Sequence, residues 1–400
     1  MKQLISSFLF IPFCLLLQAQ EISDTKFGNG MINFIAKDSS FSVKFAPRVQ
    51  SRYQSEWSYN GEDYDPADIN FSVRRARLKF GGFAFSPKLK YKIELGLSNR
   101  DISGANVYNR NTPRYILDAV VMWNFHENFE LWAGQTKLPG NIERVVSSAN
   151  LQLIDRSLLN SKFNIDRDMG IQLRHKLRLG GNWIIKEKFS ISQGEGRNIT
   201  EGNIGGLQYT SRLELLPFGE FSSKGDYSQG DLKREKSIKA MFGFTYDINE
   251  NAVKSRSNMG SYLIQSSGGL FETDITTIFL DGVIKYNGFA LTGEYANRDA
   301  DQIEALEEDG RTKTGAVVGA GSASNIQGSY LFKNNFEITA RYTNINFKKI
   351  TRLSDLKQIT FGVSKYVVGH SLKIQADISL LNASGIKDNV LFRTGFDLHF

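Results

Sequence analysis

The sequence is nearly devoid of cysteine and poor in histidine. Cys14 is the only cysteine among 400 residues. It lies in an N-terminal stretch that we expect to be removed, so the mature chain would hold no disulfide, cysteine metal site or cysteine nucleophile. The four histidines are His126, His175, His370 and His399. None belongs to a nucleophile motif or an HExxH motif, which argues against an enzyme.

Long apolar runs are missing from most of the chain. Beyond the N-terminus no segment approaches about 18 uninterrupted apolar residues, so no transmembrane helix is expected. The start, MKQLISSFLFIPFCLLLQAQ, combines Lys2, an apolar stretch over 4–17 and small Ala19 at a cleavage position. This pattern predicts a secretory signal peptide over 1–20, which leaves 21–400 as one domain. A membrane anchor is the alternative, but the stretch is short for a span.

Alternating strands dominate what remains. In residues 389–400 one parity holds Phe392, Phe396 and Phe400, and the other holds Arg393 and Asp397. Successive side chains of a strand point to opposite faces, so one face is apolar and the other polar. Such a strand fits either a soluble sandwich or an outer-membrane barrel, in which the apolar face meets lipid. The pattern of the other strands distinguishes these two folds.

The number and the connections of the strands favour the barrel. About sixteen strands can be traced between 41–53 and 389–400. Short turns, near residues 86, 126, 180, 287, 333 and 369, alternate with long polar connections, and 219–236 is the one long connection on the side of the short turns. A soluble sandwich has no reason to keep this parity. We therefore predict an all-β fold: a transmembrane antiparallel up-and-down barrel of about 16 strands.

Basic residues collect on the faces that would line the lumen. The net charge is +7. A cationic wall in a narrow channel raises the local anion concentration. The alternative is that these residues only keep the lumen wet. The cations alternate along strands and form no single exposed patch, which disfavours nucleic-acid binding. The candidate lumen residues are Arg48, Arg74, Arg75, Arg77, Lys79, Lys88, Lys90, Lys92, Arg174 and Lys176. Arg74 breaks the alternation of its strand, which predicts a rim position or a bulge.

Residues 138–166 form a long connection that is not simply polar. Their apolar residues have partly helical spacing, and long ordered loops are usually functional. We predict that this third long loop folds into the barrel and narrows it. Arg144, Ser147 and Ser148 would then offer a cation and two hydroxyl groups at the constriction. The alternatives are a helical excursion that covers a sheet edge and, for the serine pair, a helix cap.

Several motifs between residues 74 and 168 resemble the phosphate-selective porin O/P family of Gram-negative outer membranes. The motifs are RRARLKF (74–80), LDAVVMW with Asp118, GQTKLP (134–139), ERVVSS (143–148), DRS (155–157) and DRD (166–168). The resemblance implies a homotrimer of sixteen-stranded barrels with an arginine ladder that leads to the constriction. Arg74, Arg75 and Arg77 would belong to the ladder, and Asp118, Arg144, Ser147 and Ser148 would match constriction positions.

The expected function is passive diffusion of small anions through the outer membrane, with phosphate or polyphosphate implied by the resemblance. An unselective general porin is the main alternative. A hydrolase embedded in the barrel is a third possibility, but it would need a Ser/His/acid arrangement that the sequence does not show. We predict no cofactor and no metal site. The expected partners are small inorganic anions and outer-membrane lipid, not nucleic acid.

Overall fold

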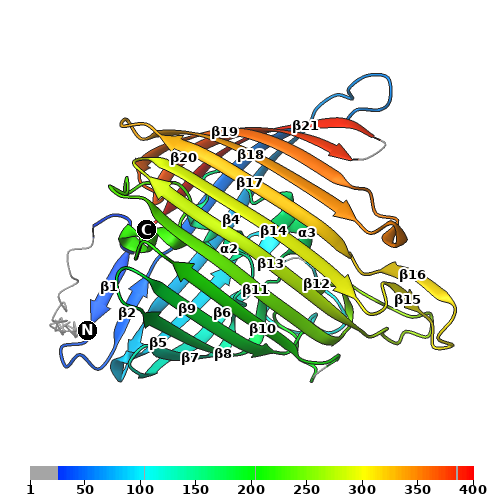
Figure 1. Cartoon of the computed structure of the whole chain (residues 1–400), viewed down its shortest axis with the longest axis horizontal. Coiled ribbons are helices and arrows are strands. Elements are labelled where there is room, and N and C mark those ends of the chain that lie inside the picture. The colour runs from blue at the N-terminus through cyan, green and yellow to red at the C-terminus, as the bar shows by residue number, and fades with distance from the viewer. Residues whose placement is uncertain (1–25, 103, 203, 384–385) are drawn as a thin grey trace, which may run out of the picture.

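The computed structural model describes residues 26–102, 104–202, 204–383 and 386–400, so the predicted signal peptide lies outside the described residues. Within them, sixteen strands form one antiparallel ring (Figure 1). The ring closes where the last strand, β21, pairs with the first, β3, from Val390↔Trp57 to His399↔Arg48. The predicted up-and-down barrel is therefore confirmed.

The strands of the ring follow one another in chain order. They are β3 (Arg48–Trp57), β4 (Asp68–Ala84), β5 (Ser86–Gly96), β6 (Ile116–His126), β7 (Phe129–Lys137), β8 (Arg167–Arg178), β9 (Ile184–Ser192), β10 (Gln208–Leu216), β11 (Lys239–Ala252), β13 (Thr273–Tyr286), β14 (Phe289–Ala300), β17 (Gly321–Leu331), β18 (Phe336–Phe347), β19 (Leu356–Val368), β20 (Leu372–Ala383) and β21 (Ile386–His399). Short turns and one long connection, residues 219–236, join them at one end, which we call the turn end, and longer loops join them at the other, the loop end.

The outer face of the ring is apolar and the inner face is polar. On β4, Phe71 and Val73 are 79% and 57% exposed, whereas Arg75, on the inner side, is 4% exposed. The same alternation leaves large apolar side chains exposed on the outside of the other strands, including Ile171, Phe244 and Ile326. A soluble sandwich would bury these side chains between two sheets. Their outward position is that of a barrel in lipid.

The first predicted strand, 41–53, is in fact two. β2 (Ser42–Phe45) ends before Pro47, and β3 begins after it. Proline lacks the N–H that a ladder needs, and here its carbonyl accepts a hydrogen bond from the Phe400 backbone N–H at 3.1 Å. β2 pairs with the turn end of β4 and with β1 (Ile32–Ile35), so this hairpin lies beside the ring rather than in it.

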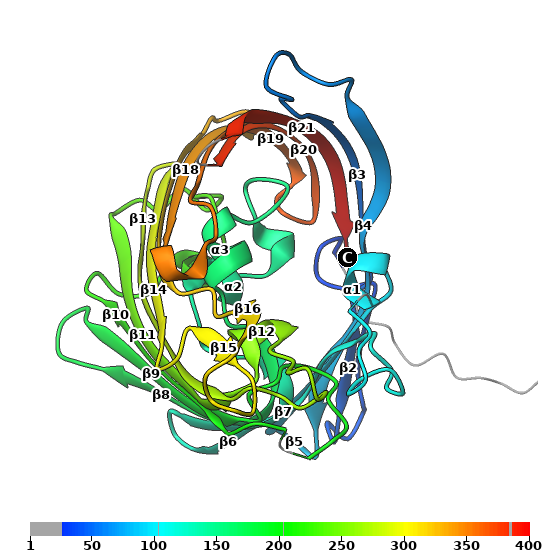
Figure 2. The same cartoon turned by 90° about the vertical axis from the view of Figure 1, so that its right-hand side faces the viewer.

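Residues 138–166, which we call the inward segment, lie inside the barrel (Figure 2). The segment contains α2 (Ile142–Val145), the 3₁₀ turn η1 (Ser148–Asn150) and α3 (Leu158–Phe163), in line with the partly helical spacing of its sequence. Ser157 caps α3, because its hydroxyl oxygen accepts a hydrogen bond from the Asn160 N–H at 3.1 Å.

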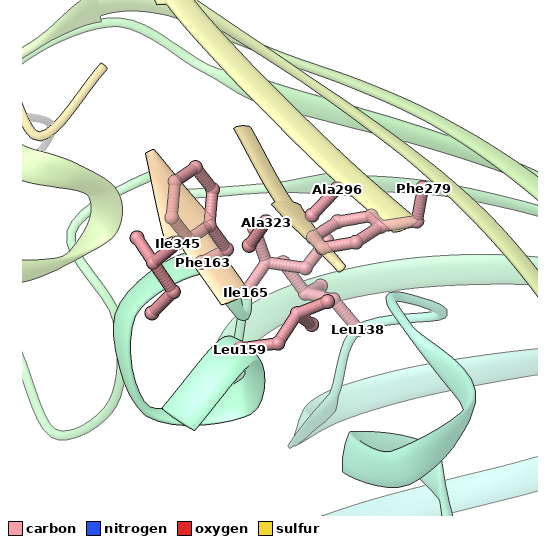
Figure 3. Packing of buried hydrophobic residues seen from close by; sticks show 8 residues of the cluster. All are labelled: Leu138, Leu159, Phe163, Ile165, Phe279, Ala296, Ala323 and Ile345. Carbon is pink, nitrogen blue, oxygen red and sulfur yellow. The ribbon is translucent and has the colours of Figure 1, made fainter. Parts of the chain in front are cut away.

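The barrel holds the inward segment against an apolar row on its inner wall. Phe279, Ala296, Ala323 and Ile345 are cross-strand neighbours on β13, β14, β17 and β18. Leu138, Leu159, Phe163 and Ile165 pack on this row (Figure 3). Most of these side chains are fully buried, and burying one large apolar side chain contributes about 1.5–3 kcal/mol. A second apolar group, which includes Ile142, Val146 and Leu151, packs on inner residues of β9, β10, β11 and β13.

The long connection at the turn end, residues 219–236, also folds inward. It contains η2 (Ser222–Tyr227), and its Gln229 N–H donates to the Asn150 carbonyl at 2.9 Å. Lys285 on β13 donates to the carbonyls of Gly225, Ser228 and Gly230 at 2.5–2.7 Å. The connection is therefore hydrogen-bonded both to the inward segment and to β13, which the polar sequence of 219–236 did not indicate.

The remaining elements are short. At the loop end they are α1 (Asn99–Ile102), β12 (Lys254–Tyr262), the hairpin β15 (Glu304–Leu306) with β16 (Lys313–Val317), and η3 (Lys349–Thr351). None of the helices in the described ranges is long and apolar enough to cross a membrane.

Candidate functional site

A β-bulge in β4 places two consecutive arginines on the inner side of the barrel. Gln50 pairs with Arg75 and the next residue, Ser51, pairs with Val73, so Arg74 is the extra residue. A bulge re-aims side chains and bends the strand. This confirms the bulge that the broken alternation predicted. Arg74 and Arg75 are 6% and 4% exposed, and both reach the inward segment.

The two arginines meet Asp155 of the inward segment. Its Oδ1 lies 2.5 Å from Arg74 and 3.4 Å from Arg75. Its Oδ2 lies 2.7 Å from Arg52 on β3 and 3.5 Å from Arg393 on β21. We call these five residues the Asp155 cluster. Burial raises the pKa of the Asp155 carboxyl, but the nearby guanidinium groups outweigh burial and hold the pKa well below its usual range. The carboxylate is therefore charged at neutral pH.

A second charged network lies next to it and joins β4, β5, α1, β6 and β8. Arg77 Nη1 contacts Glu94 Oε1 at 3.0 Å, and its Nη2 contacts Asp101 Oδ1 at 2.9 Å. Lys92 Nζ and Arg167 Nη2 contact Asp118 Oδ2 at 2.8 and 3.0 Å. Asp118 has no exposed surface. It acts as a buried counter-ion for Lys92 and Arg167, and its place at a constriction stays a prediction.

Of the other constriction candidates, Arg144 is partly exposed and its Nε donates to Asp166 Oδ1 at 2.6 Å. Ser147 is exposed and caps η1, since its hydroxyl oxygen accepts a hydrogen bond from the Ala149 N–H at 3.3 Å. Ser148 is buried, and its hydroxyl accepts from Arg48 Nη1 at 2.7 Å. The structure thus brings Arg144 and Ser147 to an accessible surface of the segment and leaves Ser148 beneath it.

Many basic side chains in the lumen donate to main-chain carbonyls of the inward segment. Lys137 donates to the carbonyls of Arg144, Val145 and Val146 at 2.8–3.3 Å. Lys373 on β20 donates to those of Ala149 and Leu151 at 2.9 and 2.6 Å. Arg48, Arg156, Arg212, Arg256, Arg298 and Arg341 make further contacts of this kind. Apart from Arg156, which belongs to the segment itself, these cations hold the segment against the barrel wall.

Most of the predicted lumen cations have partners inside the barrel, and the role of Arg74, Arg75 and Arg77 in an arginine ladder stays a prediction. Arg48 forms an ion pair with Asp397 at 2.6 Å, and Arg74, Arg75 and Arg77 also have carboxylate partners. Arg174 lies over the ring of Trp132, with 3.5 Å between its Cζ and the ring centroid, and Lys176 pairs with Glu220. Such pairing depends on contacts between distant parts of the chain, which strand parity does not reveal.

Three of the predicted lumen residues keep their charge accessible. Lys79, Lys88 and Lys90 are exposed, and no carboxylate among the described residues forms an ion pair with them. Lys88 and Lys90 share the parity of Lys92, and Lys79 is close enough to Lys92 and Lys44 to be influenced by their charges. Lys92 itself is 26% exposed in its side chain. These lysines lie toward the turn end of β4 and β5.

Sequence reasoning assigned no binding role to Arg393 and Arg341, which the fold brings to Asp155. Arg341 donates from Nη1 to the Asp155 carbonyl at 3.0 Å. Its place on the inner face of β18 could have been read from strand parity, but its partner could not. In the parts of the chain that the structure describes, no group of three or more His, Cys, Asp or Glu residues is placed to hold a metal ion.

A closed ring of sixteen strands with an apolar outer face, a charged interior and a segment folded inside it defines an outer-membrane channel of the porin class. The family model described as phosphate-selective porin O and P matches residues 47–378. The chain therefore belongs to this family. It is a porin of the outer membrane of Gram-negative bacteria, and it is a channel rather than an enzyme.

Relatives agree with the fold. An uncharacterized protein of Aquifex aeolicus (strain VF5) is 25% identical over 358 residues, which are 83% of this chain and 80% of that protein. The anion-selective porin from Comamonas acidovorans has a TM-score of 0.54 at 15% identity, and the match covers 90% of this chain and 100% of that one. The channel DcaP of Acinetobacter baumannii has a TM-score of 0.54 at 12% identity, with 91% and 99% covered. Identities this low establish the shared barrel only.

Proposed function

We propose that this porin is selective for small anions and conducts phosphate or polyphosphate by passive diffusion. One observation carries the proposal, the excess of cations on the inner face of β3, β4 and β5. Arg52, Arg74 and Arg75 share the single carboxylate of Asp155. Lys79, Lys88 and Lys90 have no carboxylate partner in the described residues. Fixed positive charge in a narrow low-dielectric channel concentrates anions and repels cations.

Family membership and the printed description of the Comamonas porin as anion-selective support the proposal. Arginine offers a planar fork that matches phosphate oxygens, and lysine a compact mobile charge. A row of lysines that leads to an arginine cluster is suited to capture an anion from water and then to bind it more specifically.

The decisive measurement is the reversal potential of the purified protein in planar bilayers under a KCl gradient. We expect the sign of anion preference. A potential of the opposite sign would overturn the proposal, and a value near zero would favour the general unselective porin. Phosphate and pyrophosphate are then titrated against chloride current, because block at low concentration separates a phosphate channel from a general one.

The double variant Lys79→Gln, Lys90→Gln tests which residues supply the field. Both side chains are exposed, so the substitution should leave the fold intact and move the reversal potential toward zero. Lys348→Gln is the matched control, since Lys348 is a partly exposed lysine that Asp299 already neutralises at 2.6 Å. An unchanged potential in the double variant would place these lysines off the conduction path.

We also propose a homotrimer in outer-membrane lipid. The family resemblance supports it, and OmpT of Vibrio cholerae, a barrel with a TM-score of 0.50 and 12% identity, was solved in a trimer form. Cross-linking in native membranes, followed by gel analysis with and without heating, tests the stoichiometry. A single band at the monomer position in both samples would refute it.

A further inference from the structure

The Asp155 cluster has more positive charge and more hydrogen-bond donors than its carboxylate can satisfy. We propose that the Asp155 carboxylate occupies an oxyanion-binding site in the channel wall and competes with the permeating solute for it. The inference rests on the proposed anion-conducting function. In this role Asp155 sets the affinity of the site for a phosphate-like solute.

Three arginines of the cluster share one carboxylate partner. Arg48 and Arg77 each have carboxylates outside the cluster, Asp397 for the former and Glu94 with Asp101 for the latter. Within the described part of the chain, Arg52, Arg74 and Arg75 form ion pairs with Asp155 alone. Three guanidinium groups therefore share one negative charge, and the local excess of positive charge attracts a second anion.

Guanidinium N–H donors around Asp155 also lack hydrogen-bond partners among the described residues. Arg74 is 6% exposed, and its Nε is buried without a hydrogen-bond partner. Arg52 Nε and Arg341 Nε are also buried and unpartnered. A guanidinium group carries five N–H donors, and a carboxylate offers about four lone-pair sites. A tetrahedral oxyanion with three or four oxygens can accept from more of these donors than the flat Asp155 carboxylate does.

The bulge in β4 brings a second arginine to the same carboxylate oxygen. A salt bridge that only anchors the inward segment needs one arginine, and a regular strand would supply it. The extra residue in β4 instead places Arg74 and Arg75 side by side at Asp155 Oδ1. Bulges recur where a strand re-aims a side chain toward a functional site. The strand here departs from regular pairing at the position that doubles the cationic groups around one oxygen.

Exchange between the two anions explains how a strongly cationic site can still release its solute. An entering phosphate displaces the tethered carboxylate, and the returning carboxylate displaces the phosphate. The arginines are then never left without a counter-ion in a partly desolvated wall, where an unpaired charge is costly. Conduction requires such weak net binding.

The test compares phosphate block of chloride current in wild type and Asp155→Asn, with inorganic phosphate as the probe. Asparagine keeps the shape of the side chain and removes the competing charge. We expect the half-blocking phosphate concentration to fall about tenfold, as for the loss of one charge-assisted competitor. Asp155→Glu should retain the wild-type value. Asp299→Asn, which removes the same charge from an exposed pair at the loop end, should also leave it unchanged.

The origin of the gain is tested by adding Arg74→Gln and Arg75→Gln to Asp155→Asn, which should abolish it. A gain that survives without both arginines would overturn the proposal. So would weaker phosphate block in Asp155→Asn together with faster tryptic cleavage after Arg156, because that pair of results defines Asp155 as an anchor of the segment. If the wild type itself prefers cations, the proposed function fails; if it prefers anions but Asp155→Asn blocks like wild type, only the competition fails.

Discussion

The position of the inward segment should depend on Phe163 more than on any other single apolar side chain. Phe163 is fully buried against the apolar row, its ring lies 6.0 Å from that of Phe347, and its carbonyl accepts from Arg298. Replacing a buried phenylalanine with alanine costs about 3–5 kcal/mol. The strand ladder does not use this side chain, so the cost falls on docking of the segment and not on closure of the barrel.

A loss of that size changes the docked-to-undocked ratio by about a hundredfold or more, since about 1.4 kcal/mol corresponds to a factor of ten. Phe163→Ala should therefore show larger or flickering single-channel conductance and faster tryptic cleavage after Lys162, whose carbonyl is also held by Arg298. Far-ultraviolet circular dichroism should show an unchanged barrel.

Phe361→Ala is the matched control, because Phe361 is 57% exposed on the outer face of β19. The same deletion there removes no contact with the inward segment. Conductance and proteolysis that do not differ between Phe163→Ala and Phe361→Ala would show that the apolar row does not hold the segment.

Two further predictions concern the charges of the lumen. Arg212 is fully buried between Asp281 and Glu214 and also donates to the Gly140 carbonyl at 3.0 Å. Glu214 keeps Lys188 as a partner, but Asp281 has no other ion pair among the described residues, so Arg212→Met leaves one buried carboxylate unpaired. The substitution should cost about 3–5 kcal/mol, seen as a lower unfolding temperature in detergent; an unaltered melting curve would contradict this. Raising KCl from about 0.1 M to about 1 M shortens the Debye length from about 10 Å to about 3 Å. If the exposed lysines create the anion preference, the preference should therefore weaken. A preference that stays constant would indicate direct anion binding instead.

Strand periodicity was sufficient to predict the barrel, because the lipid outside and the water inside impose opposite chemistry on alternate residues. The alternation around β13 shows this clearly, since Thr277, Asp281 and Lys285 face inward while Leu280 is exposed. Pro47 lies inside the predicted strand 41–53, and in the structure it separates β2 from β3. A proline in a strand removes one donor, and whether the ring tolerates the loss depends on the neighbouring strand.

Strand parity predicted which residues of the candidate site face the lumen, but it did not predict which side chains they contact. Parity assigned Arg75 and Arg77 to the lumen, yet their partners Asp155 and Asp101 lie in connections whose path is fixed by tertiary packing. In the sequence, only the apolar residues of 138–166 indicated that this connection folds into the barrel. Their complement, the row at Phe279, Ala296, Ala323 and Ile345, is spread over four strands and is recognisable only once the registers are known.

Cations in this lumen have two separate roles, and the partners of each cation show which role it has. Lys373 and Arg298 donate hydrogen bonds to carbonyls of the inward segment, so these cations stabilise the position of that segment. Lys79 has no ion-pair partner in the described residues, and Arg74 shares Asp155 with other arginines, so their charge remains available to a solute. A count of basic residues therefore overstates the field that an ion experiences. Selectivity should follow the second group, and substitutions in the first should alter conductance through the shape of the pore.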